Sequence, residues 1–252
     1  MARQKSIIKL HGTLGDITFY RSKDGYMARE RGGISASRIN SDPKFQRTRE
    51  NMAEFGRAGK AGKLLRNSIQ SLLRTSADPR MVSRLTQQFV KVIQEDGVNP
   101  RGLRNVIDGE AELLQGFEFN NQSKLSTTIV APMTYSIDRS TGQATVALDP
   151  YVPTDSIIAP TGSTHYQLVS AAMDIDFEVV SYTTDHAETA ILPLDPVSTT
   201  ASQLSNSLPA GSAHPMFLIF GVNFYQEVNS QFYELKNGSY NTLQIVKVSG
   251  TP

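Results

Sequence analysis

Hydrophobic and polar positions follow two different periods along this chain of 252 residues. In the first half, apolar residues recur every three or four positions, as they do on one face of an α-helix. From Phe117 onward, short apolar runs alternate with polar residues and turn signals, as they do in β-strands. The pattern therefore predicts an α+β fold with a helical region first and an antiparallel β-rich region second.

Two helix starts are marked by a capping side chain followed by proline. Ser41-Asp42-Pro43 begins a helix that we expect to run to about Arg74, and Asp78-Pro79 begins a second helix that Gly97 ends. The second helix carries the clearer apolar stripe, formed by Met81, Leu85, Phe89, Val92 and Ile93. Residues 100–115 are expected to form one or two short helical turns.

A β-hairpin is predicted before these helices, over residues 6–31. Ile17, Phe19 and Arg21 alternate with polar neighbours, and Asp24-Gly25 is a pair that tolerates the positive φ angles of a tight turn. Tyr26–Arg29 then forms the returning strand.

The second half contains nine short runs of strand character, separated by turns such as Thr141-Gly142 and Asn237-Gly238. They are Leu125–Val130, Met133–Ile137, Gln143–Leu148, Tyr166–Ala172, Phe177–Thr183, Thr189–Leu194, Met216–Tyr225, Gln231–Leu235 and Leu243–Val248. This spacing predicts an antiparallel, immunoglobulin-like β-sandwich without the cysteine pair and core tryptophan of antibody domains. We expect residues 195–215 to be a long exposed loop, and we place the domain boundary between residues 1–115 and 116–252.

Charge is distributed unevenly along the chain, although the formal net charge is only +1. Residues 1–110 hold 21 of the 25 Lys and Arg and 11 of the 24 Asp and Glu, a net charge of +10, which leaves −9 on residues 111–252. A basic half needs an anionic partner, and the acidic half of the same or another copy can supply it.

The basic residues are densest between residues 38 and 66, and they have two interpretations of equal weight. One is a solvated helix face, and the other is a surface that neutralises phosphates or an acidic protein. No helix-turn-helix, zinc-finger or RNP-like pattern accompanies them, so any nucleic-acid binding would be non-specific. The residues are Arg38, Lys44, Arg47, Arg49, Arg57, Lys60, Lys63 and Arg66.

Three glycines, Gly56, Gly59 and Gly62, lie on roughly one face of the first predicted helix. Each costs a helix up to about 1 kcal/mol relative to alanine, so they indicate either a helix break or close packing, and we favour close packing. With Lys63 they resemble a phosphate-binding loop, but that loop needs Ser or Thr after the lysine and a preceding buried strand. Leu64 follows here, in a helical context, which argues against it.

No residue cluster predicts catalysis, a cofactor or a metal site. The chain has no cysteine, and its four histidines do not form a ligand cluster. Asp174 and Asp176 share one strand face and could contact a cation or a basic partner, but an isolated carboxylate pair is a weak signal. Serine-hydrolase, metalloprotease and Rossmann motifs are not found.

We expect no membrane insertion, because no segment approaches the ~18 consecutive apolar residues that span a bilayer. The segment Met1–Lys9 has charge but no apolar stretch, so we expect no signal peptide and synthesis in the cytoplasm. Release by lysis or by a dedicated secretion route stays open, as does a place in a larger particle.

Residues 10–66 carry a family resemblance. The stretches are Gly12–Phe19 (GTLGDITF), Asp24–Arg29 (DGYMAR) and Phe45–Asn51 (FQRTREN). They resemble an uncharacterised group of small proteins common in Bacteroidota genomes, built as a Gly-rich hairpin, a Gln/Arg helix and a β-sandwich. The resemblance implies a bacterial or phage-like origin and this layout, but no function and no site residues.

These observations together predict a non-enzymatic structural protein that assembles with itself, head to tail, without a cofactor. The basic first half would dock on the acidic sandwich of the next copy. The alternative is a non-specific nucleic-acid-binding or virion-associated protein. A sugar-binding or adhesive module is a third class, which depends on fold analogy alone.

Overall fold

The computed structural model describes residues 1–30 and 32–250, apart from the side chains of residues 236 and 237. Arg31, the last residue of the predicted hairpin, lies outside this set. The chain forms two compact units, Met1–Arg49 and Glu50–Pro252. The boundary predicted between residues 115 and 116 does not coincide with this division, because the helices after residue 50 share a hydrophobic core with strands of the second half.

The N-terminal unit contains a four-stranded antiparallel sheet, in the order β1-β4-β3-β2. Its strands are β1 (Ala2–Arg3), β2 (Gly12–Leu14), β3 (Ile17–Ser22) and β4 (Gly25–Glu30). Gly15 and Gly25 adopt φ angles of 57° and 109° at the two tight turns, a region that glycine reaches without strain. The short helix α1 (Ala36–Ser41) and a 3-10 turn (Pro43–Phe45) follow.

Three main helices come next: α2 (Gln46–Ser68), α3 (Gln70–Ser76) and α4 (Met81–Gln94). Helical geometry is interrupted at Ile69, with φ −124° and ψ 30°, so the single helix predicted to reach Arg74 is in fact two. The apolar stripe predicted for the second helix is confirmed, because the five residues of that stripe are the buried residues of α4.

The C-terminal unit contains two antiparallel sheets, of six and three strands. The larger has the order β12-β11-β7-β8, with β13 beside β11 and β9 beside β7. Its strands are β7 (His165–Asp176), β8 (Ser181–Glu188), β9 (Leu192–Pro193), β11 (Met216–Val228), β12 (Gln231–Glu234) and β13 (Thr242–Ser249). The smaller, in the order β10-β6-β5, contains β5 (Met133–Asp138), β6 (Gln143–Leu148) and β10 (Ser202–Ser207).

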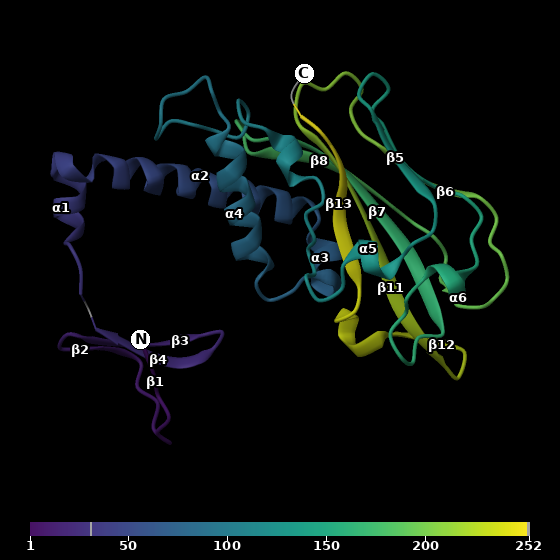
Figure 1. Ribbon diagram of the computed structural model, residues 1–252, viewed down its shortest axis with the longest axis horizontal. Coiled ribbons are helices and arrows are strands. Elements are labelled where there is room, and N and C mark those ends of the chain that lie inside the picture. Colours follow the sequence, from purple (N-terminus) through teal and green to yellow (C-terminus); the bar gives the residue numbers. More distant parts are fainter. Residues whose placement is uncertain (31, 251–252) are drawn as a thin grey trace. The chain divides into compact units, whose positions relative to one another are not determined.

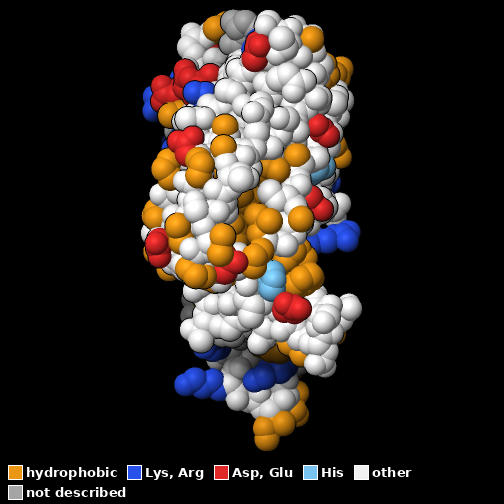
Figure 2. Space-filling view, turned by 90° about the vertical axis from the view of Figure 1, so that its right-hand side faces the viewer, with side chains coloured by type: hydrophobic (Ala, Val, Ile, Leu, Met, Phe, Trp, Pro, Cys, Tyr) orange, Lys and Arg blue, Asp and Glu red, His pale blue; other side chains and the backbone are white. Residues whose placement is uncertain are grey.

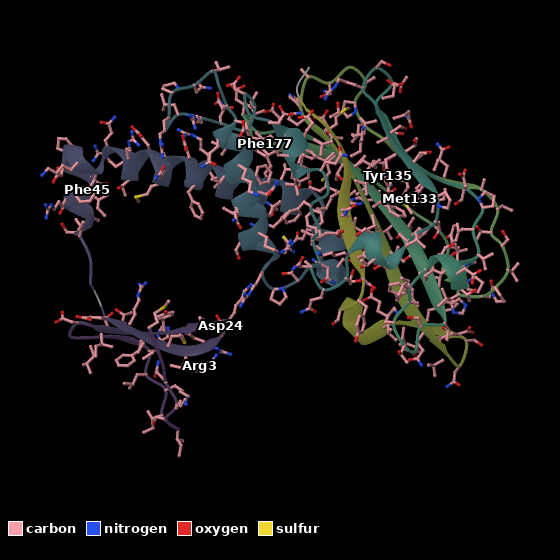
Figure 3. The ribbon with its side chains drawn as sticks, viewed as in Figure 1. Arg3, Asp24, Phe45, Met133, Tyr135 and Phe177 are labelled. Carbon is pink, nitrogen blue, oxygen red and sulfur yellow. The ribbon has the colours of Figure 1, made fainter. Side chains whose placement is uncertain are left out.

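The larger sheet is curled (Figure 1), and its central strands β7, β11 and β13 are mostly buried on both faces. Along β11, Phe217 and Ile219 join the core shared with the helices, whereas Leu218 and Phe220 join the core shared with the smaller sheet. Phe177, labelled in Figure 3, packs edge-on against Phe217 and against Phe89 of α4, at ring-centroid distances of 6.4 and 5.8 Å. The predicted α+β class is therefore confirmed, whereas the immunoglobulin-like topology stays a prediction.

The run Leu125–Val130 was predicted to be a strand, and this is wrong. Leu125–Thr128 is a turn of helix, α5. The Thr128 hydroxyl donates a 2.8 Å hydrogen bond to the Lys124 carbonyl, and such local side-chain bonds compete with strand pairing. The remaining short helical segments are α6 (Pro153–Ser156) and the 3-10 turns Ala111–Leu114 and Leu235–Gly238.

The long exposed loop predicted for residues 195–215 is also wrong in its middle. Strand β10 pairs with β6 over six residues, from Ser202 opposite Leu148 to Ser207 opposite Gln143. Leu204 and Asn206 point inward and are buried. The alternation of a β-strand was missed in this segment because Asn206, one of the two inward residues, is polar.

Candidate interaction surface

The sheet of the N-terminal unit has one mostly apolar face, which is called the apolar face below. Residues opposite each other in an antiparallel pair project to the same side, so the register places Phe19 with Ala28, and Ile17 with Leu14. Ala2 and Tyr26 lie on this face too, and so do two charged residues, Arg21 opposite Tyr26 and Glu30 opposite Ile17. The other face is more polar, and it holds Thr13, Thr18, Tyr20, Met27 and Arg29.

No side chain of this unit is buried, among the described residues 1–30 and 32–49. On the apolar face Leu14 is 72% exposed and Ile17 is 45% exposed. The stabilising contacts lie on the surface. Arg21 lies over the Tyr26 ring at 5.6 Å, and Arg3 donates a 2.9 Å hydrogen bond to the Asp24 carbonyl (Figure 3). Small sheets need a covered hydrophobic face for stability, so this face has the properties of an interface.

The charge difference follows the two structural units. Residues 1–49 carry 11 Lys and Arg against 4 Asp and Glu, a net charge of +7. Residues 50–252 carry 14 against 20, a net charge of −6. Figure 2 shows one side of the molecule, where hydrophobic and acidic side chains both reach the surface. The two kinds of unit therefore have net charges of opposite sign.

The eight residues of the predicted basic face have different roles. Arg49 donates hydrogen bonds to the carbonyls of Ile39 and Asp42 at 2.7 and 3.0 Å, and Arg57 donates to the carbonyl of Gly102 at 2.6 Å. Arg66 donates to the carbonyl of Gly62 at 3.0 Å. These three arginines are half-buried, and their hydrogen bonds to backbone carbonyls stabilise the local fold. The remaining five are exposed: Arg38, Lys44, Arg47, Lys60 and Lys63.

The three glycines differ in their surroundings. A Cβ at Gly62 would lie 3.4 Å from the Phe89 ring and 3.7 Å from Leu85, so this glycine lies where α2 packs against α4. A Cβ at Gly56 or Gly59 would meet no atom of the described chain within 4 Å. Helix α2 continues through all three positions. Of the three glycines for which close packing was predicted, Gly62 packs closely against another helix of the same chain.

The carboxylates of Asp174 and Asp176 both contact His214. Nδ1 of the imidazole lies 2.9 Å from Asp174 Oδ1, and Nε2 lies 3.2 Å from Asp176 Oδ2. The pair was predicted to contact a cation or basic partner, and a histidine 40 residues from Asp174 takes that position. The sequence holds no spacing signal for this cluster, because strand pairing brings the two segments together.

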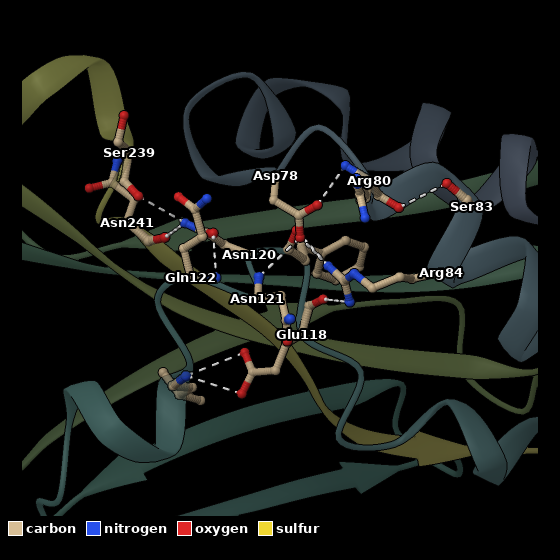
Figure 4. Close-up of polar contacts among 12 residues, drawn as sticks. Asp78, Arg80, Ser83, Arg84, Glu118, Asn120, Asn121, Gln122, Ser239 and Asn241 are labelled. Atoms are coloured by element: carbon tan, nitrogen blue, oxygen red, sulfur yellow. Dashed lines mark hydrogen bonds and ion pairs between the residues drawn. The ribbon is translucent and has the colours of Figure 1, made fainter. Parts of the chain in front are cut away.

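A second polar cluster joins the start of α4 to residues 118–121 (Figure 4). The Arg84 guanidinium forms an ion pair with Asp78, donates a 2.7 Å hydrogen bond to the Glu118 carbonyl, and lies over the Phe117 ring at 5.1 Å. Asp78 also accepts hydrogen bonds from the backbone N–H groups of Arg80 and Asn121. Burial alone would raise the pKa of Asp78, but these donors and Arg84 lower it below its ordinary value.

Glu118 is the titratable group of this cluster with the largest pKa change. Its carboxylate accepts a 3.1 Å hydrogen bond from the Leu125 N–H and a 2.6 Å bond from the Gln244 amide. Burial raises the pKa of Glu118 to about 7, although those bonds and the nearby Lys124 and Arg84 act in the opposite direction. Sequence reasoning missed Glu118, because it contacts residues far away in the chain.

Within the described part of the chain, no group of three or more His, Cys, Asp and Glu side chains could hold a metal ion. None of the described helices is long and apolar enough to cross a membrane. A comparison with protein-family models finds no match, and a comparison with curated proteins finds no significant relative. The function must therefore be inferred from the surfaces and clusters described above.

Proposed function

We propose that this protein is a non-enzymatic structural protein that assembles with itself through its N-terminal unit. One observation carries the proposal. The sheet of that unit presents a mostly apolar face, and no described side chain of residues 1–49 is buried. If a neighbouring copy covers this face, apolar surface is removed from water, which stabilises the contact by about 25 cal/mol per Å².

Charge favours one occupant of this face over the others. Pairing two N-terminal units face to face would bring two charges of +7 together, whereas the C-terminal unit carries −6. In the proposed contact, the hairpin of β3 and β4 is the donor, and the stacked sheets of the next copy, taken to be immunoglobulin-like, are the acceptor. Such a head-to-tail contact produces a ring where it closes, and a filament or tube where it does not.

A pair of substitutions on the two faces of the same strand tests the proposal. Leu14→Asp places a charge on the apolar face, whereas Thr13→Asp places the same charge on the opposite face. We expect the wild type and T13D to form species larger than a monomer in light scattering at micromolar concentration, and L14D to remain monomeric. Both variants should fold, because both positions are exposed.

The proposal fails if the wild-type protein is monomeric at every salt and protein concentration. That result would favour the alternative that the basic and acidic parts of one molecule pair with each other. Equal assembly of L14D and wild type would instead show that the apolar face is not the contact. Salt should slow assembly more than it weakens the final complex, because charge acts mainly on encounter.

Non-specific nucleic-acid binding is the second candidate, and the five exposed cations of the basic segment favour it. An electrophoretic shift on random-sequence DNA at low salt tests it. Binding that falls steeply as salt rises would support it, because each neutralised phosphate releases condensed counterions. The absence of a shift at low salt would eliminate this candidate.

A further inference from the structure

A polar pocket of about 520 Å³ lies next to Glu118 and the Arg84 cluster, wholly within the C-terminal unit. Its volume lies in the range of small-molecule sites. Three segments that are distant in sequence form the wall: helix α4, residues 113–126, and Gln244 of β13. The pocket is therefore a product of the fold and not of one local motif.

The pocket wall is cationic, although the unit as a whole is acidic. Arg84, Lys91 and Lys124 line the pocket together with one carboxyl group, that of Glu118. Both lysines are exposed, and neither ammonium lies within ion-pair distance of a described carboxylate. Arg84 is held in place by Asp78, whose carboxylate offsets its charge, so the unpaired positive charge of the wall comes from the two lysines. An anion is the ligand charge that this wall favours.

Amide side chains make up much of the remaining wall. Those of Gln87, Gln115 and Asn121 line the pocket, and none forms a hydrogen bond to a described residue. An amide group can both donate to and accept from a hydroxyl group. The wall therefore suits a ligand that carries hydroxyl groups as well as negative charge.

Glu118 determines how the charge of the pocket changes with pH. The groups that face it are Arg84 from α4, Lys124 before α5, Tyr135 from β5 and Gln244 from β13. Burial first, and the charge of Glu118 second, raise the pKa of Tyr135. With a pKa of about 7, the carboxyl group is mostly neutral one pH unit lower and mostly ionised one unit higher. The neutral form removes a repulsion and adds a hydrogen-bond donor.

We propose that this pocket binds a small hydroxylated carboxylate, of the sugar-acid class. The ligand carboxylate lies between Lys91 and Lys124, its hydroxyl groups bond to the amides, and the Glu118 carboxyl group binds a proton as the ligand enters. This site is independent of the self-assembly contact, and it can exist whether or not that contact does.

Calorimetric titration of the full chain with galacturonate tests the proposal, with galactose as the uncharged match. We expect measurable binding of galacturonate only, weaker by about tenfold at about pH 8 than at about pH 6. Glu118→Gln should bind at about pH 8 as tightly as the wild type does at about pH 6. Lys124→Gln should weaken binding about tenfold, the loss of one charge-assisted bond, whereas Lys247→Gln on the exposed side of β13 should not.

Three results would overturn the proposal: no galacturonate binding at millimolar concentration, equal binding of galactose, or equal loss in the Lys124 and Lys247 variants. Binding that is the same at both pH values would overturn the role given to Glu118. Thermal unfolding of each variant checks that the pocket is folded. None of these outcomes depends on the oligomeric state.

Discussion

At Gly221, in the middle of β11, a Cβ atom would come within 2.3 Å of the Thr242 carbonyl oxygen. The neighbour is backbone of β13 and cannot turn aside as a side chain can. Gly59 in α2 has no described atom within 4 Å of the same position. Replacing glycine by alanine is therefore expected to destabilise the fold at Gly221 and to stabilise it at Gly59. The difference comes from the atoms that surround each site.

Gly221→Ala should lower the free energy of unfolding by about 2 kcal/mol, because β13 must shift to accept the methyl group. Gly59→Ala should raise it by about 0.5–1 kcal/mol, because alanine restricts the unfolded chain and favours the helix. Urea denaturation followed by circular dichroism measures both. Equal effects at the two sites would contradict this account of β11 and β13.

Asp96, just after α4, organises the loop that follows. Its carboxylate accepts hydrogen bonds of 2.9 Å from the backbone N–H groups of Val98, Asn99 and Asn105. Burial alone would raise the pKa of Asp96, but these donors outweigh it and lower the pKa to about 2. The sequence predicted only that the helix ends at Gly97. The donors to Asp96 are backbone N–H groups, and these are the same in every residue type except proline, so the sequence does not mark them.

Asp96→Asn should lower the free energy of unfolding by about 2 kcal/mol at neutral pH, because an amide NH₂ would face an N–H donor. The folded-state pKa lies below the unfolded value of about 3.9, so the carboxylate stabilises the fold above that pH. This contribution is lost as the pH falls towards about 2. The difference between wild type and D96N should therefore shrink over that range in urea denaturation, and a constant difference would contradict it.

At the scale of elements, strong periodicity was a reliable guide and mixed polarity was not. Helix α4 and strand β6 were predicted well, since their apolar residues repeat with one period. Strand β10 was missed, because the buried residue that follows Leu204 in its alternation is Asn206. The pocket at Glu118 was missed for another reason, since three distant segments form it and no local pattern joins them.

Asn206 connects the two sheets of the C-terminal unit through hydrogen bonds. Its side chain accepts a 2.8 Å bond from the Ser170 hydroxyl of β7 and donates a 3.2 Å bond to the Asp185 carbonyl of β8. Asn206→Ala should lower the free energy of unfolding by about 2 kcal/mol, because buried partners lose their bonds. Ser202→Ala, at an exposed position of the same strand, should change it by less than about 0.5 kcal/mol in the same urea titration.

At the scale of the whole molecule, burial divides the chain more sharply than its sequence pattern does. The C-terminal unit has two hydrophobic clusters, one on each face of the larger sheet. The N-terminal unit has no buried side chain among its described residues. The charge pattern predicted two partners of opposite sign, but it placed their boundary after the helices, because α2 is basic along its whole length and also packs into the core.

Hydrogen exchange should therefore report two stabilities in one chain. Backbone amides of β7 and β11 are enclosed between two cores, so they should exchange only on global unfolding of the C-terminal unit and be the slowest in the chain. Amides of β3 and β4 should exchange within seconds to minutes in dilute protein, because no core opposes local opening. As the concentration rises and copies associate, the protection of the β3 and β4 amides should increase, since binding stabilises the bound form by mass action.

The L14D variant should lack this concentration dependence, whereas T13D should keep it. Slow exchange of β3 and β4 in dilute wild-type monomer would show that the sheet is already covered within one molecule, and the self-assembly proposal would then lose its main support.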